Sequence, residues 1–287
     1  MTRLVSPLII AAALMATGAY AQTAPQPAAQ DFQVGALTVT ALHDADFNPP
    51  NDGKAFGLGQ SVDAIGEVLT DHGAPATPIH LSVDALLVHD GARLVLIDTG
   101  IGGALQASLA KAGITADAVT DVLITHAHPD HIGGLMTKDG KPAFPNAKVR
   151  MSEAEWASVK AQPDLAPFVS VIGPQVEAFT PGGEVAPGIA SIALPGHTPG
   201  HTMYEIASGD AKLIDIGDTA HSSILSLEKP DWKIEFDGDQ VEGAQQRRAE
   251  LTRLAASGEQ VFAPHFPFPG VGKIAADGDG FKWLPAQ

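Results

Sequence analysis

The sequence predicts a layered α/β fold with a metal site at one sheet edge. Short apolar strands alternate with amphipathic helices, and several of these strands end in histidine or aspartate. The 287-residue chain is long enough to bury a substantial core. Hydrophobic residues make up 45% of it and charged residues 17%, which is typical of globular proteins rather than of disordered chains.

The first 31 residues are predicted to lie outside this fold. Residues 1–21 have the pattern of a signal peptide, with Arg3, an apolar run at 8–16, and Ala19-Tyr20-Ala21 as the cleavage site. The run is too short to span a membrane comfortably, so we expect a periplasmic or secreted protein. Residues 22–31 are expected to be a flexible leader, and residues 32–287 a single domain that begins near Phe32.

In the first half of the domain, one strand is expected before the first helix, and two strands joined by a hairpin turn are expected after it. Ser61 fits an N-cap, and Gly113 is expected to close a second helix. The long segment between the first two strands could cover a substrate or serve only as scaffold. The expected strands are 34–42, 81–89 and 93–97, and the expected helices are 62–73 and 105–112.

A strand at 120–124 leads directly into the cluster His126-Ala127-His128-Pro129-Asp130-His131. Alternate side chains of an extended chain point the same way, so His126 and His128 can reach one metal ion together. Asp130 and His131 follow a proline, where the chain must turn, and can reach a second position nearby. Neutral imidazoles and ionised carboxylates are ligands that Zn²⁺ takes. A hydrogen-bonded histidine cluster at a surface turn is the alternative, and it explains this spacing less well.

The second half repeats this arrangement, and its strand ends deliver further candidate ligands. Pro195-Gly196-His197-Thr198-Pro199-Gly200-His201 follows one strand, Gly217-Asp218 follows another, and Pro264-His265 follows a third. Convergence of strand ends on one sheet edge is how α/β proteins build sites. The expected strands are 147–151, 189–194, 203–206, 212–216 and 260–263. One helix is expected to begin after Ser152, with Glu155 in a capping box, and another is expected to span 242–256.

Other residues near these motifs have two interpretations. Asp98, at the end of a buried strand, either orients a metal-binding histidine or only shapes a turn. We expect His201 and His221 to be hydrogen-bonded structural imidazoles and Tyr204 to lie in the core. Phe266 and Phe268 either line an apolar pocket or pack in the core.

In their order and residue types, these motifs resemble those of the metallo-β-lactamase superfamily from about residue 36 to the C-terminus. The resemblance implies a four-layer αββα sandwich with a two-metal site. It assigns His126, His128 and His197 to one divalent ion, Asp130, His131 and His265 to the other, and Asp218 as the bridge. Zinc is the expected metal, and manganese, iron or cobalt suit the same ligands.

Within the superfamily, Asp218 disfavours β-lactams as substrates, because members that act on them carry a thiolate or a non-bridging residue there. Glyoxalase-type thioesterases usually add a C-terminal helical domain that this chain does not show. The His265–Gly272 segment and Gly217–His221 are most similar to methyl parathion hydrolases and N-acyl homoserine lactonases. Lys273 departs from that branch, where histidine is expected.

This resemblance implies a metal-dependent hydrolase whose bound hydroxide attacks a lactone carbonyl, with phosphotriesters or aryl esters as alternative substrates. Asp218 and Asp130 are the candidate catalytic carboxylates, Asp130 as a proton donor to the leaving group. A non-catalytic metal-binding scaffold is the alternative from another class. The chain has no cysteine, which excludes thiolate ligands, disulfides and a cysteine nucleophile.

The charge of the chain bears on its partners. Formal net charge is −16, which disfavours nucleic acid and anionic membrane surfaces. A small-molecule substrate is therefore the expected partner, and a homodimer is an assembly that the sequence leaves open.

Overall fold

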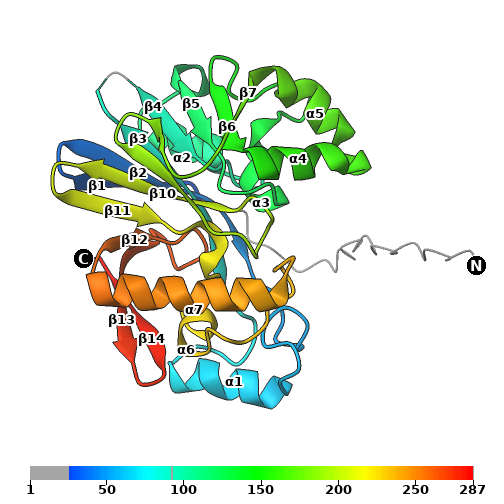
Figure 1. The fold of residues 1–287 in the computed structure, drawn as a ribbon, viewed down its shortest axis with the longest axis vertical. Coiled ribbons are helices and arrows are strands. Elements are labelled where there is room, and N and C mark those ends of the chain that lie inside the picture. The colour runs from blue at the N-terminus through cyan, green and yellow to red at the C-terminus, as the bar shows by residue number, and fades with distance from the viewer. Residues whose placement is uncertain (1–25, 92, 287) are drawn as a thin grey trace, which may run out of the picture.

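In a computed structural model, which describes residues 26–91 and 93–286, two β-sheets pack face to face and helices cover their outer faces (Figure 1). The residues predicted to form a signal peptide lie outside the described residues. Among the described residues, no helix is both long and apolar enough to cross a membrane.

The first sheet has seven strands in sequence order, antiparallel from β1 to β4 and parallel from β4 to β7. Parallel pairing places the carboxyl ends of β4 and β5 at the same edge. The strands are β1 (Ala28–Val34), β2 (Leu37–Phe47), β3 (Leu81–His89), β4 (Leu94–Ile97), β5 (Asp121–Leu123), β6 (Lys148–Ser152) and β7 (Val176–Phe179).

Strand β1 corrects the predicted start of the domain. It begins at Ala28 rather than near Phe32, so residues 28–31 belong to the sheet and not to the leader. They pair in register with β2, from Ala28 opposite His43 to Asp31 opposite Thr40. An edge strand can expose half of its side chains, so a polar, alanine-rich segment forms one without a strongly apolar pattern.

The second sheet also has seven strands, in the order β14-β13-β12-β11-β10-β9-β8, and its only parallel pair among the described residues is β11–β12. That pair brings the carboxyl ends of β11 and β12 together. The strands are β8 (Glu184–Ala186), β9 (Ile189–Ala193), β10 (Thr202–Ser208), β11 (Ala211–Asp215), β12 (Gln260–Phe262), β13 (Val271–Asp277) and β14 (Gly280–Pro285).

Helices complete the outer layers. Ser61 and Ser152 cap α1 and α4 as predicted, since their hydroxyl oxygens accept hydrogen bonds from Ala64 N and Glu155 N, both at 3.1 Å. The helices are α1 (Val62–Asp71), α2 (Leu105–Lys111), α3 (Pro129–Ile132), α4 (Glu153–Ala161), α5 (Ala166–Ile172), α6 (Leu225–Glu228) and α7 (Gln240–Ser257).

Three apolar clusters show the order of the layers. One lies between the sheets and includes Val39, Leu86, Ile206 and Phe262. A second joins the outer face of the first sheet to α2, α4 and α5, and a third joins the second sheet to α7. The four-layer αββα sandwich is therefore confirmed.

The long segment between β2 and β3, which contains α1, forms a separate apolar cluster. Phe56, Ile65 and Leu69 pack there against Leu225 and Ile234. A β-bridge between Phe56 and Ile234 fixes the contact. The segment thus lies against the chain that follows Asp218, beside the candidate site.

Candidate metal centre

The candidate ligands converge because strands of both sheets end at one place. His126 and His128 follow β5, α3 carries Asp130 and His131, His197 follows β9, a short turn after β11 carries Asp218, and His265 follows β12. Two contacts join the sheets just before the cluster. Tyr204 donates a hydrogen bond to Ile124 O at 2.8 Å, and Thr202 N donates to Thr125 O at 2.9 Å. Tyr204 is thus a buried structural residue, as predicted.

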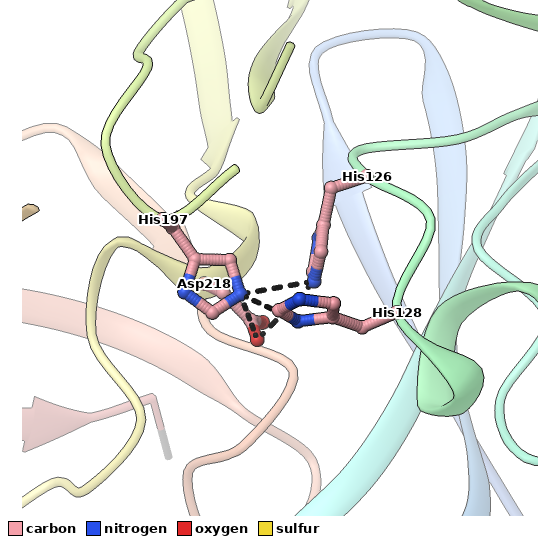
Figure 2. Close-up of side chains that lie close together, drawn as sticks. All are labelled: His126, His128, His197 and Asp218. Carbon is pink, nitrogen blue, oxygen red and sulfur yellow. Dashed lines mark hydrogen bonds and ion pairs between the residues drawn. The ribbon is translucent and has the colours of Figure 1, made fainter. Parts of the chain in front are cut away.

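One group of side chains, which we call the three-histidine position, contains His126, His128, His197 and Asp218 (Figure 2). His197 Nε2 lies 3.1 Å from His126 Nε2 and 2.9 Å from His128 Nδ1. Asp218 Oδ2 lies 3.2 Å from His197 Nε2 and 3.5 Å from His126 Nε2. Three imidazole nitrogens and one carboxylate oxygen therefore face a common point.

The second group, which we call the aspartate position, contains Asp130, His131 and His265. Asp130 Oδ2 lies 3.5 Å from His265 Nε2 and 3.9 Å from His131 Nε2. The other oxygen of Asp218, Oδ1, lies 3.1 Å from both imidazoles. The two oxygens of Asp218 thus face different groups, the arrangement expected of a bridging carboxylate.

The unpaired atoms of the site fit a divalent cation. His131 Nε2, His265 Nε2 and Asp218 Oδ1 are buried and have no hydrogen-bond partner among the described residues. Buried polar atoms without partners are costly unless something else satisfies them. Imidazole nitrogens and carboxylate oxygens that converge in this way suit zinc and related metals.

The electrostatics of the site keep its carboxylates ionised. Burial alone would raise the pKa of Asp218, but the imidazoles of His131 and His265 lower it well below the ordinary value. The same imidazoles outweigh burial at Asp130 and lower its pKa too. At neutral pH, Asp130 must therefore take up a proton before it can donate one.

The histidines divide into two kinds. Burial lowers the pKa of His126 well below its ordinary value and, with nearby His197, lowers that of His128 to about 3. Burial also opposes charge on His131 and His265, but Asp218 and other carboxylates raise the pKa of His131 well above its ordinary value and that of His265 to about 9. Without metal, His131 and His265 of the aspartate position are therefore protonated at neutral pH, whereas His126 and His128 are neutral.

Asp98 orients His131, the first of the two interpretations that the sequence allowed. Asp98 Oδ2 lies 2.7 Å from His131 Nδ1 and accepts a hydrogen bond from Thr125 Oγ1 at 2.7 Å, while Oδ1 accepts from Thr125 N at 2.9 Å. With Nδ1 of His131 donating to Asp98, Nε2 is left as the metal-facing lone pair. Asp98 also forms the turn, with a positive φ of 60°.

His197 has a corresponding partner that the sequence did not indicate. Asp237 Oδ1 lies 3.0 Å from His197 Nδ1, and Asp237 Oδ2 accepts from Arg247 Nη1 at 3.2 Å. Arg247 is 1% exposed and also donates to the backbone oxygens of Pro230 and Trp232. Asp237 lies in an irregular loop, 40 residues from His197, so no periodic pattern marks it.

His201 has the structural role that was predicted. Its Nδ1 donates to Leu194 O at 3.0 Å, and its Nε2 accepts from Asp218 N at 3.0 Å. Burial, then nearby His197, lowers its pKa to about 3, so the ring is neutral and one tautomer satisfies both contacts. His201 therefore fixes the backbone of Asp218.

His221 faces the site more directly. Its Nε2 lies 3.1 Å from Asp218 Oδ2, and its ring stacks on that of His265 at a centroid distance of 5.5 Å. Phe56 and Phe236 contact its other sides. Neither ring nitrogen has a hydrogen-bond partner among the described residues, so the predicted hydrogen-bonded structural role of His221 is not borne out.

The loop that carries His197 is held between two helices. A Cβ on Gly196, whose φ is 124°, would lie 2.7 Å from Gly243 N of α7. A Cβ on Gly200 would lie 2.2 Å from Glu155 N of α4. The glycines of Pro-Gly-His-Thr-Pro-Gly-His are thus the points where the two helices touch the loop, and no side chain fits at either.

The site opens to solvent at Asp130, whose side chain is 33% exposed. Nearby, a pocket of about 430 Å³ is lined by Ser82, Phe268 and His43, among others. Ser82 also belongs to the site, because its carbonyl oxygen accepts from His265 Nδ1 at 2.8 Å. Phe268 therefore lines a pocket, whereas Phe266 is fully buried against Trp283 and packs in the core. Lys273 lies on the exposed face of β13.

Comparisons with known proteins find a family model and solved structures to which the chain is similar. The family model described as metallo-beta-lactamase superfamily matches residues 79–264, more than half of the chain. The structure of AidC, a dizinc quorum-quenching lactonase in complex with a product, is 30% identical with a TM-score of 0.85, and the match covers 91% of this chain and 98% of that one. A hydrolase in the beta-lactamase superfamily, AbOPH, is 26% identical with a TM-score of 0.81 over 91% of this chain and 98% of its own.

A curated hydroxyacylglutathione hydrolase from Photobacterium profundum is 35% identical over 47% of this chain and 46% of its own length. This chain spans about half the length of the curated relatives that it matches.

Proposed function

Because the chain belongs to the metallo-β-lactamase superfamily, we propose that it is a dinuclear metal-dependent hydrolase that opens lactones of the N-acyl homoserine type. The observation that carries the dinuclear assignment is the position of Asp218, with one oxygen facing each group of ligands. A scaffold that binds a single structural metal has no need of two adjoining ligand groups.

In this proposal, His126, His128 and His197 hold one ion, Asp130, His131 and His265 hold the other, and Asp218 joins them. Zinc is the proposed metal. Two such ions supply Lewis acidity and a hydroxide nucleophile at neutral pH. The residues of the chain then have distinct tasks: Asp98 and Asp237 hold the imidazoles in the required tautomer, and His201 holds Asp218.

Asp130 is the proposed proton carrier of the reaction. It lies at the solvent-exposed side of the site and is ionised at neutral pH, so it would first accept a proton and then return it to the leaving alkoxide. Asp130 also supplies a candidate ligand. Its replacement is therefore expected to impair both metal binding and proton transfer.

A pocket with an aromatic side chain near the site supports a substrate with an acyl chain. Phe268 lines the pocket that also contains Ser82, whose carbonyl oxygen accepts a hydrogen bond from His265 Nδ1. AidC, to which the chain is similar over nearly the whole length of that protein, is described as a lactonase. Phosphotriesters and aryl esters are the second candidate class, which the similarity to the hydrolase AbOPH leaves open.

A substrate panel on fully metallated protein tests this proposal. We expect turnover of N-hexanoyl homoserine lactone that a chelator abolishes and added zinc restores. Faster turnover of paraoxon or of a glutathione thioester than of every lactone would overturn the lactone assignment. Absence of bound metal and of hydrolysis would overturn the proposal as a whole.

The predicted export of the protein is part of the proposal and has its own measurement. N-terminal sequencing of the protein from its native host is expected to begin at Gln22. A mature chain that retains Met1 would contradict export by this signal.

A further inference from the structure

Glu155 is a buried carboxylate that the chemistry above does not use. Glu155 lies on the first turn of α4, and only 3% of its surface is exposed. The sequence suggested a capping box, in which Glu155 would turn back toward Ser152. Only the Ser152 half of that motif forms, and the carboxylate of Glu155 points toward the metal-binding loops instead.

Three hydrogen bonds define what Glu155 holds. Oε1 accepts from Ala127 N at 2.7 Å, and Ala127 is the residue between His126 and His128. Oε2 accepts from Thr198 Oγ1 at 2.7 Å and from Gly200 N at 3.1 Å, in the loop that carries His197. One carboxylate therefore connects both loops that supply the three-histidine position.

The first turn of α4 strengthens this connection. The hydroxyl of Ser152 donates to Gly200 O at 2.7 Å, and Gly200 approaches the helix too closely for any side chain. The two loops belong to different sheets, since one follows β5 and the other follows β9. No β-ladder joins them in the described part of the chain, so α4 holds the two loops together with the hydrogen bond from Thr202 N to Thr125 O.

Among the described residues, no arginine or lysine forms an ion pair with Glu155, and its hydrogen-bond partners are neutral N–H and O–H groups. A buried charge balanced only by dipoles is unfavourable unless a cation lies nearby. A metal ion held by the loops that Glu155 connects would supply that cation. The hydrogen bonds and the charge of Glu155 both favour a metal ion held between the two histidine loops.

We propose that Glu155 is a positioning residue that sets the spacing of the two histidine loops and thereby the metal affinity of the three-histidine position. This inference rests on the metal-binding part of the proposed function and is independent of the substrate. Outer partners of metal ligands typically change affinity by about 10- to 100-fold, and Glu155 acts on three ligands together.

The test compares Glu155→Gln with Glu153→Gln, a matched control on the same turn. Glu153 is exposed, and its carboxylate accepts a hydrogen bond from Thr180 Oγ1, away from the histidine loops. In Glu155→Gln the amide N–H₂ replaces one acceptor and faces a donor. Zinc affinity is measured by chelator competition in a His265→Ala background, where the three-histidine position keeps its full ligand set, and in a His128→Ala background, where it does not.

We expect Glu155→Gln to weaken zinc binding by about 10- to 100-fold in the His265→Ala background and by less than about threefold in the His128→Ala background. Glu153→Gln should change neither. The melting temperature of the metal-free protein is recorded as well, because a purely structural role would lower it while leaving affinity unchanged. Unchanged affinity, or equal weakening in both backgrounds, overturns the proposal.

If Glu155→Gln does not fold, Thr198→Val decides the matter. It removes one of the three donors and keeps the shape of the side chain, so we expect several-fold weaker zinc binding in the His265→Ala background alone. Affinity within error of the parent overturns the proposal. These titrations need no substrate, so failure of the lactone assignment would leave them interpretable.

Discussion

The two metal positions share Asp218 but are held by different parts of the molecule. The three-histidine position depends on helices, since α4 supplies Glu155 and α7 supplies Arg247, which fixes Asp237. The aspartate position depends on strands and turns. Asp98 follows β4 and orients His131, and the carbonyl oxygen of Ser82 on β3 orients His265.

This difference teaches that one site can have two different supports, which meet at Thr125, where the hydroxyl donates to Asp98 and lies 3.1 Å from His126 Nδ1. A change in helix docking should affect the three-histidine position first, whereas a change in the first sheet should affect the aspartate position first. Only Asp218 belongs to both.

Replacement of Asp218 should have the largest effect, because it removes a ligand from both positions at once. We expect Asp218→Ala to bind less metal and to lose more activity than the ~100-fold typical of an outer partner. Metal content by mass spectrometry and turnover of the lactone measure this. Full metal content would contradict the bridging role.

Asp215→Asn is the control for Asp218→Ala. Burial, with the nearby Asp98, raises the pKa of Asp215 well above its ordinary value, so a neutral amide suits this position. It accepts a hydrogen bond from Gly217 N, which an amide oxygen retains. Metal content is expected to stay unchanged.

Arg247 is next, because it supports only the three-histidine position. Arg247→Ala leaves Asp237 buried without its cation, and removal of one partner of a buried pair costs about 3–5 kcal/mol. The free energy of unfolding, measured in denaturant, should fall by that amount. Arg248→Ala breaks an exposed pair with Asp231 and an exposed hydrogen bond to Asp279 O, and should cost about 1 kcal/mol. Equal losses in the two variants would refute the distinction.

Asp98→Asn and Asp237→Asn separate the two positions directly. Each removes the carboxylate that fixes one imidazole, so each should weaken zinc binding at its own position by about 10- to 100-fold. Stepwise chelator competition should show one weakened site in each variant, and a different one. If both variants weaken the same step, the supports are not independent.

The pH dependence of zinc affinity is expected to differ least between the two metal positions. In the metal-free protein His131 and His265 hold protons below their raised pKa values, and at the other position only the pKa of His197 is raised. Metal must displace these protons, so affinity falls as pH falls. From pH 7 to pH 6 we expect a loss of about 100-fold at the aspartate position, where two imidazoles hold protons, and a smaller loss at the three-histidine position, where one does. Calorimetry in buffers of different ionisation enthalpy counts the protons released, and equal counts would contradict this pattern.

The candidate ligands could be predicted from the sequence because each follows an apolar strand in a recognisable motif. His126, His197 and His265 are examples, and the structure brings all three to one place. The supporting residues could not be predicted in the same way. Asp237 lies in an irregular loop, and Glu155 occupies a position where a local capping motif explained it equally well.

The fold was predictable to a similar extent. Strands with buried apolar runs, such as β3 and β5, were predicted within a residue or two. The start of β1 and the hairpin of β13 and β14 were not, because these edge strands expose polar side chains and lack a strong pattern.

The close contacts at Gly196 and Gly200 also bear on how such a protein can evolve. No side chain fits at either glycine, so these two positions of the loop that carries His197 cannot be substituted without moving a helix. Gly59 and Gly73, in the segment between β2 and β3, have no atom within 4 Å of an added Cβ, so their positive φ restricts them but space does not. New substrate preferences are therefore expected to arise by drift in that segment, while the metal loops are inherited unchanged.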